Sequence, residues 1–219
     1  MTAIRGSILA GGQARRFDGR PKGLEEVGGA RVVDRLAALL TDVLGTPPLL
    51  IANDPGAPAW GTGLRVVADA RPDCGTLGGL YTAVREAPAP VVCVAWDMPF
   101  VTAGLVAALA EGLSVADVVI PASGGPRGVE PLCAGYGPAC LDPMADAMDR
   151  GDFRAIAFHP QVRVRRLDLE ALPAAALPPA GVDPFFNVNT PEDLREARAQ
   201  WPLFASSPSS AGKTPGRRP

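Results

Sequence analysis

Short apolar runs alternate along this chain with longer stretches that carry apolar residues at helical spacing. Residues 4–9 form the first run, a glycine-rich loop follows, and apolar side chains then recur three and four positions apart between Val32 and Leu40. A short buried run is typical of a strand, whereas the wider spacing is typical of a helix. This pattern predicts strands at 4–9, 49–52, 64–67, 91–94, 118–120, 132–136 and 162–167. It predicts helices at 32–40, at 80–86, from Thr102 onward and at 138–150.

Strands that alternate with helices predict an α/β fold, in which a mostly parallel sheet is covered by helices on both faces. A chain of 219 residues that is 47% hydrophobic has enough length for one domain with a sizeable core, and we expect that domain to span residues 1–201. Residues 172–184 are rich in alanine and proline and predict a surface excursion without its own core. Residues 202–219 predict a disordered tail.

Charge and hydropathy exclude several classes of protein. A net charge of −2 argues against a protein that coats nucleic acid, because phosphate backbones are held by clustered positive charge. Apolar runs stay well short of the roughly 18 residues of a membrane span, and residue 1 leads almost directly into a strand. We therefore expect no membrane span, no signal peptide and a cytoplasmic location.

Cysteine and histidine positions give no sign of a zinc site or a redox motif. Cys74, Cys93, Cys133 and Cys140 include no C-x-x-C pair, and we expect them to be reduced. His159 is the single histidine and precedes a proline, so we expect a surface or turn residue.

Lysine is scarce in this chain. Only Lys22 and Lys213 stand among its 21 basic residues. Lys213 follows Gly212 as in a phosphate-binding P-loop, but Ser207 occupies the position of the earlier glycine, so we interpret Lys213 as a solvated tail charge. A bias of the coding genome toward arginine explains the scarcity as such; the position of Lys22 is the informative feature.

Paired glycines and several cations follow the first predicted strand. Gly11 and Gly12 are followed by Arg15, Arg16 and Lys22, at the end of a strand where open α/β sheets bind ligands. Glycines let backbone N–H groups approach a phosphate, and the cations neutralise it. The loop lacks the G-x-G-x-x-G fingerprint of dinucleotide-binding proteins. We therefore favour phosphate binding over a merely tight, solvated turn.

This segment resembles the amino-terminal signature of the molybdenum cofactor guanylyltransferase (MobA-type) family, L-A-G-G-x-x-x-R-M-G-x-D-K-x-L. The matching residues are Leu9, Ala10, Gly11, Gly12 and Arg16 and, with one additional residue after Arg16, Lys22 and Leu24. The chain departs from the signature at Phe17-Asp18, where the family has Met-Gly, and at Pro21, where it has an acid. The resemblance implies a three-layer, Rossmann-like nucleotidyltransferase fold of the nucleotide-diphospho-sugar transferase type.

Further segments extend the resemblance toward the nucleotide. Asn53 and Asp69 follow predicted strands at positions where the family contacts its nucleotide, and the segment 75–80 resembles the family's G-P-L-A-G, with Gly78 inside it. Glycines there permit close backbone approach to a base or ribose. The resemblance implies the following nucleotide contacts: Leu9, Ala10, Gly11, Gly12, Lys22, Asn53, Asp69, Gly78 and Asp97.

Asp97 lies in a segment, Trp96-Asp97-Met98-Pro99-Phe100, similar to the family's C-D-x-P-[FY], with Trp96 in place of cysteine. It follows a buried strand and so lies at the ligand-binding edge of the predicted sheet. Mg²⁺ is commonly held by one or two carboxylates together with phosphates and water. We therefore favour Asp97 as a Mg²⁺ ligand over the alternative that it only begins the turn before Pro99.

The segment 186–194 reads Phe-Asn-Val-Asn-Thr-Pro-Glu-Asp-Leu and resembles the family's F-N-V-N-T-P-E-D-L. Thr190 as N-cap, Pro191 at the first helical position and Asp193 predict a helix start. Capping leaves Asn187 and Asn189 unexplained, and their spacing in an extended segment directs both amides to one side. The resemblance implies that they contact a pterin.

Glu130 belongs to a segment that resembles the one before the family's acceptor site. It either faces this pterin substrate or is an ordinary hairpin acid.

Together these residues indicate nucleotidyl transfer, in which an acceptor phosphate attacks the α-phosphorus of a nucleoside triphosphate. Lys22, Arg16 and Asp97 are the candidate catalytic residues, and Mg²⁺ is the expected cofactor. The resemblance implies GTP and Mo-molybdopterin as substrates, and molybdoenzymes or their chaperones as recipients of the product. Two alternatives remain: cytidylyl transfer from CTP to the same pterin, and a regulatory module that binds a nucleotide without turnover.

Overall fold

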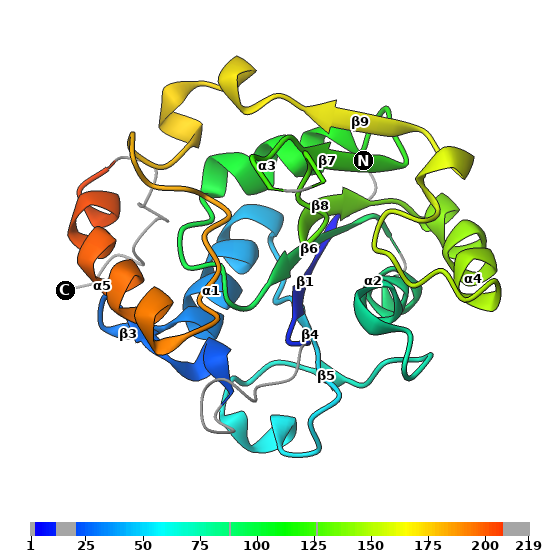
Figure 1. Cartoon of the computed structure of the whole chain (residues 1–219), viewed down its shortest axis with the longest axis horizontal. Helices are drawn as coiled ribbons and strands as arrows, with labels where there is room; N and C mark the ends of the chain where they lie inside the picture. Colours follow the sequence, from blue (N-terminus) through cyan, green and yellow to red (C-terminus); the bar gives the residue numbers. More distant parts are fainter. Residues whose placement is uncertain (1–2, 12–20, 88, 126, 208–219) are drawn as a thin grey trace.

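A seven-stranded sheet forms the centre of the molecule (Figure 1). The computed structural model describes residues 3–11, 21–87, 89–125 and 127–207. Across the sheet, the strands are ordered β5 (Val66–Val67), β4 (Leu49–Ile51), β1 (Arg5–Leu9), β6 (Val91–Ala95), β8 (Cys133–Tyr136), β7 (Val118–Pro121) and β9 (Val164–Leu167).

Most neighbouring strands run parallel. The pairs β5–β4, β4–β1, β1–β6 and β7–β9 are parallel, and β8 is antiparallel to both β6 and β7. The carboxyl ends of β1, β4, β5 and β6 therefore lie along one edge of the sheet, where α/β proteins bind ligands. This arrangement confirms the mostly parallel α/β fold predicted from the hydrophobic pattern.

Helices cover both faces of the sheet and complete three layers (Figure 1). The first face packs against α1 (Val32–Leu44) and α3 (Ala103–Gly112), with α5 (Pro191–Ala205) joined to the same core, and the second against α2 (Gly75–Glu86) and α4 (Leu141–Asp149). The central strand β6 is continuously apolar because both of its faces are buried. Val92 and Val94 belong to the core on the first face, Val91 and Cys93 to the core on the second, and all four are buried.

Helix α2 begins at Gly75, five residues before the predicted start. Its first turns hold three glycines, which are weak helix formers, so the sequence pattern favours a loop there. Tertiary packing decides otherwise, because Leu77 is fully buried and a Cβ at Gly78 would lie 2.9 Å from the carbonyl oxygen of Arg71.

A small hairpin follows the first loop, and the sequence pattern did not predict it. Strands β2 (Glu26–Val27) and β3 (Ala30–Arg31) are antiparallel and are joined by Gly28 and Gly29. Both glycines have positive φ, 64° and 78°, as tight hairpin turns require. The indole of Trp201 on α5 packs directly over Gly28, and the guanidinium of Arg35 lies 3.9 Å from the centre of that indole.

The two segments expected to lie outside the core are partly built into it. In the Ala/Pro-rich excursion Val182 is buried, and the carbonyl oxygen of Ala176 accepts a hydrogen bond from the Thr102 hydroxyl at 2.6 Å. Helix α5 continues four residues beyond the predicted boundary at 201, to Ala205, because the buried ring of Phe204 packs on Phe100. Residues 208–219 of the expected tail lie outside the described residues.

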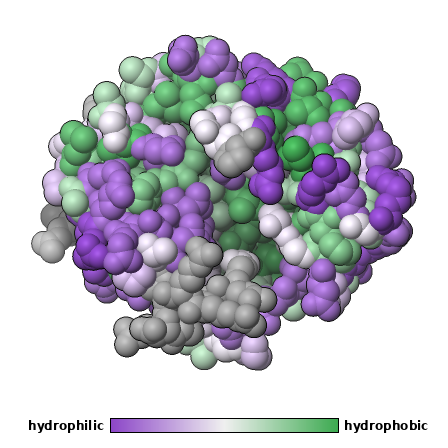
Figure 2. Space-filling model, in the orientation of Figure 1, coloured by the Kyte–Doolittle hydropathy of each residue, from purple (hydrophilic) through white to green (hydrophobic). Residues whose placement is uncertain are grey.

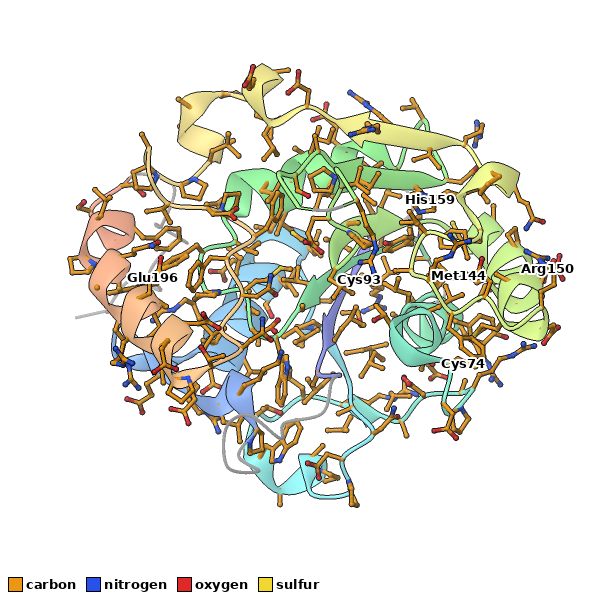
Figure 3. The ribbon with its side chains drawn as sticks, viewed as in Figure 1. Cys74, Cys93, Met144, Arg150, His159 and Glu196 are labelled. Atoms are coloured by element: carbon orange, nitrogen blue, oxygen red, sulfur yellow. The ribbon has the colours of Figure 1, made fainter. Side chains whose placement is uncertain are left out.

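Figure 3 labels two of the four cysteines, Cys74 and Cys93, and the histidine, His159. All four cysteines are free thiols, as expected, and Cys93 lies in the middle of the sheet, well away from Cys74 near the start of α2.

His159 begins a short 3-10 helix, His159–Gln161, so the expected turn is present. Its ring, however, is half-buried against Phe158, and its Nε2 is shielded from solvent with no partner among the described residues. Burial lowers the pKa of His159 from 6.5 to about 4.

None of the helices described above, within residues 3–207, combines the length and the hydropathy needed to cross a membrane.

We expect Gly28→Ala to destabilise the protein more than Gly29→Ala. Alanine is strained at positive φ in both places, which costs about 1 kcal/mol. A Cβ at residue 28 would also lie 2.0 Å from the indole of Trp201, whereas a Cβ at residue 29 meets nothing within 4 Å. The clash adds about 1–3 kcal/mol to the loss. Urea unfolding followed by circular dichroism measures the difference, and equal losses would contradict the packing of α5 on the hairpin.

His159 makes the stability of the fold depend on pH. Because the fold holds the neutral ring, this contribution is complete above the unfolded pKa of about 6.5 and is lost as the pH falls through the folded pKa of about 4. We expect the wild type to lose about 2–3 kcal/mol more than His159→Gln between pH 7 and pH 4. Parallel urea titrations at several pH values test this, and identical pH profiles would show that the ring is solvated.

Candidate active site

A pocket of about 680 Å³ opens at the carboxyl ends of β1, β4 and β6. In Figure 2 the surface of the molecule is hollowed near the middle of the view, and hydrophobic residues form the bottom of the hollow. Its size is that of a small-molecule or cofactor site. Eight residues singled out from the sequence line it: Leu9, Gly11, Lys22, Asn53, Asp69, Asp97, Asn187 and Asn189. The fold therefore brings residues from five separate sequence segments to one cavity.

Lys22 joins three of these segments, its own and those of Asp97 and Asn189, through direct contacts. Its ammonium group donates hydrogen bonds to the carboxylate of Asp97 and, at 2.7 Å, to Oδ1 of Asn189. Both charged side chains are well shielded, with 15% of the Lys22 side chain and 7% of the Asp97 side chain exposed. The backbone N–H of Val188 also donates to the Asp97 carbonyl oxygen at 2.9 Å. The carboxyl end of β6 thus holds the segment 187–189 through both main chain and side chain.

The turn that carries Lys22 rests on Trp96. Residues Lys22–Leu24 form a short 3-10 helix, and a Cβ at Gly23 would lie 2.4 Å from the Trp96 indole. Only glycine fits there without displacing the ring. The indole is almost fully buried and stacks on Trp60 with 5.1 Å between ring centres. The tryptophan that replaces the cysteine of the family pattern therefore forms the surface on which the Lys22 turn lies.

Asn53 and Asp69 form a reciprocal pair on another wall of the pocket. The amide nitrogen of Asn53 donates to the Asp69 carboxylate at 2.7 Å, and the backbone N–H of Asp69 donates to the Asn53 amide oxygen at 2.7 Å. Burial raises the pKa of the Asp69 carboxyl group, and the bond from Asn53 acts in the opposite direction. The pair links the ends of β4 and β5 and presents polar groups to the cavity.

Sequence reasoning missed part of the lining. Asp73, Gly75, Thr76 and Gly79 face the pocket, whereas Gly78 lies outside its lining and packs against backbone. Asp73 is the one non-glycine residue with positive φ, 62°, within the described part of the chain. Aspartate tolerates that conformation better than most residues, so an Asp two positions before a glycine was the available signal.

Four other predicted site residues have different placements. Gly12 and Arg16 lie outside the described residues. Ala10 is buried and does not line the pocket. Glu130 also lies outside the lining; its carboxylate accepts the backbone N–H of Leu132 at 2.9 Å, as in the hairpin acid considered above. Burial raises the pKa of Glu130.

The described lining of the pocket carries more acidic than basic side chains. Among the described lining residues Asp69, Asp73 and Asp97 oppose a single lysine, so a bound triphosphate needs further positive charge. No group of three histidine, cysteine or acidic side chains that could enclose a metal ion occurs among the described residues. The Asp97 carboxylate beside Lys22 could hold a divalent cation such as Mg²⁺, which prefers oxygen ligands and takes few of them from the protein.

Comparisons with known proteins agree with this geometry. Residues 6–164 match the family described as the MobA-like NTP transferase domain. The chain is 35% identical over 199 residues to the probable molybdenum cofactor guanylyltransferase of Pelotomaculum thermopropionicum, covering 90% of this chain and 93% of that protein. It is 30% identical over 205 residues to the molybdenum cofactor guanylyltransferase of Desulfosudis oleivorans, with 91% and 96% covered.

A solved structure shows the same fold. Molybdopterin-guanine dinucleotide biosynthesis protein A from Archaeoglobus fulgidus superposes with a TM-score of 0.72 at 24% identity, covering 89% of this chain and 97% of that one. Sequence, fold and pocket thus point the same way, and the chain belongs to the MobA-like NTP transferase family, together with the molybdenum cofactor guanylyltransferases it resembles.

Proposed function

We propose that this protein transfers GMP from GTP to molybdopterin carrying molybdenum, with formation of the guanine dinucleotide cofactor and release of pyrophosphate. The observation that carries the proposal is the convergence of Lys22, Asp97 and Asn189 in one pocket. They come from three segments, each matching a different motif of the family. Relatives named molybdenum cofactor guanylyltransferase, similar over about nine-tenths of the chain, support this choice of substrates.

The proposed reaction needs alignment more than covalent help from the protein. An oxygen of the acceptor phosphate attacks the α-phosphorus of GTP, the bond from that phosphorus to the bridging oxygen breaks, and pyrophosphate leaves with the electron pair. A phosphate acceptor is already ionised at neutral pH, so no general base is required. The barrier falls when two mutually repelling anions are held in line beside fixed positive charge.

Each wall of the pocket takes one part of this task. We assign Leu9, Gly11 and the Asn53–Asp69 pair, which line the pocket, to the nucleotide. We assign Asn187 to the pterin; it lines the pocket, and its amide nitrogen donates to the Phe185 carbonyl oxygen at 2.7 Å. Lys22 lines the same pocket and supplies positive charge to the reacting phosphates.

Asp97 is the residue that would hold Mg²⁺. Its carboxylate is the acidic group beside Lys22 at the end of β6, and carboxylate oxygen is the donor that this ion prefers. When bound, the ion supplies positive charge that lowers the repulsion between the triphosphate and the acceptor phosphate.

We expect pyrophosphate release with GTP when the protein is supplied with the molybdenum-loaded pterin and Mg²⁺. GTP, CTP, ATP and UTP are tested one at a time, with a reaction lacking the pterin as the control. A preference for CTP would identify a cytidylyltransferase and overturn the guanylyl assignment. No release with any nucleotide, while GTP binding is retained in calorimetry, would identify a regulatory nucleotide-binding module.

We expect Lys22→Arg to lower kcat on the order of 100-fold, although the charge is kept. A planar guanidinium cannot occupy the compact ammonium position between Asp97 and Asn189, because it is wider and its donors form a rigid fork. Lys213→Arg is the matched control, since it changes the only other lysine of the chain. Steady-state kinetics of both variants are compared with the wild type. Full activity of Lys22→Arg would show that charge alone is needed at this position.

A further inference from the structure

The start of helix α5 carries a capping box with one contact more than capping requires. The backbone N–H of Asp193 donates to the Thr190 hydroxyl at 3.1 Å, and the Thr190 N–H donates back to the Asp193 carboxylate at 2.8 Å. These two bonds complete the box. The same carboxylate oxygen also accepts the N–H of Asn189 at 2.8 Å, one residue before the cap. Asp193 therefore fixes the backbone of a residue that points into the pocket.

That additional contact leads directly to Lys22. Asn189 directs its amide oxygen at the Lys22 ammonium, and the preceding Val188 is fully buried and bonded to the main chain of Asp97. An ammonium group has three N–H donors. Asp97 and Asn189 accept two of them among the described residues, which leaves the third for a phosphate oxygen.

The far end of α5 contacts the segment that follows Lys22. Trp201 packs over Gly28, and Nε of Arg198 donates to the Glu26 carbonyl oxygen at 2.9 Å. The helix thus touches the segment 22–31 twice, through Asn189 at its start and through the hairpin near its end. Because the same helix fixes both the amide that binds the ammonium and the hairpin that follows the lysine turn, the long lysine side chain loses little further freedom when substrate binds.

We propose that Asp193 is a positioning residue for Lys22 and acts through Asn189. The capping carboxylate holds the Asn189 backbone, the Asn189 amide holds the ammonium, and the ammonium is thereby aimed at the reacting phosphates. This proposal rests on the proposed function and gives Asn189 a task on the nucleotide side, beyond the pterin contact that its motif implies.

The two halves of the capping box provide a matched pair of variants. Asp193→Ala and Thr190→Ala each remove one half of the same box, so both should lower the melting temperature, Asp193→Ala somewhat more because its carboxylate accepts two hydrogen bonds. Only Asp193→Ala releases the backbone of Asn189. We expect it to lower kcat at least tenfold below that of Thr190→Ala, with the KM for the nucleotide changed less than kcat. Equal kcat values in the two variants would overturn the proposal.

A double-mutant cycle tests whether Asp193 acts through Asn189. If it does, Asp193→Ala should add almost no further loss of kcat in a protein that already carries Asn189→Ala. Independent, multiplying losses would show that Asp193 supports the site by general stability alone and would overturn the stated route.

Lysine signals give a readout that does not depend on activity. The full chain is labelled with ¹³Cε,¹⁵Nζ-lysine, and its two lysine signals are assigned with Lys213→Arg. We expect the Lys22 signal of the wild type and of Thr190→Ala to differ from that of a free lysine, and the signal of Asp193→Ala to move toward it. Asp193→Asn, which keeps one acceptor oxygen, should move it less and serves if the alanine variant does not fold. An unmoved Lys22 signal in Asp193→Ala, or in Asp193→Asn where the alanine variant does not fold, would overturn the proposal even if no nucleotide supports turnover. A moved signal without turnover would count against the proposed function only.

Discussion

The ion pair between Lys22 and Asp97 is the constraint around which the rest of the structure is organised. It joins residues 75 positions apart, and both side chains are largely shielded from water. A shielded charge is costly unless a partner and further hydrogen bonds compensate it. Asn189, 167 positions from Lys22, supplies such a bond, and the main chain of Val188 binds that of Asp97. The charge on Lys22 is therefore compensated only when the segments that carry Lys22 and Asn189 meet at the end of β6.

The need to bring Lys22 to the end of β6 explains several local features. The Lys22 turn must lie close to β6, and the buried Trp96 indole provides a flat surface that admits only glycine at residue 23. The hairpin after the turn is closed by two glycines with positive φ, and Trp201 covers one of them. Helix α5, which contributes little to the sheet itself, holds this hairpin and Asn189 together. The pocket is consequently assembled by elements outside the central sheet as much as by the strand ends.

Agreement between pattern and structure was best where one physical signal acted alone. The continuously apolar run in β6 reflects burial on both faces, and Thr190, Pro191 and Asp193 form the predicted helix start. Agreement was poorest where tertiary contacts outweighed local preference. Three glycines favour a loop at the start of α2, yet the burial of Leu77 and the approach of the Arg71 backbone to Gly78 make it helical. The excursion that contains Val182 showed a surface-like composition but packs on α3.

The chain by itself determined the fold class, the strand-end position of the site and most of the residues that line it, because hydrophobic period and short motifs are local properties. Only the tertiary structure decided how those residues are paired. Sequence assigned Lys22 to the triphosphate and Asn189 to the pterin as separate contacts, whereas in the structure the Lys22 ammonium binds both the Asn189 amide oxygen and the Asp97 carboxylate. Contacts between segments up to 167 positions apart leave no trace in local spacing, since they arise when parallel strands bring their carboxyl ends to one edge. For the same reason, the sequence explains Asp193 as a helix cap, and only the structure shows its hydrogen bond with the backbone of Asn189 in the pocket.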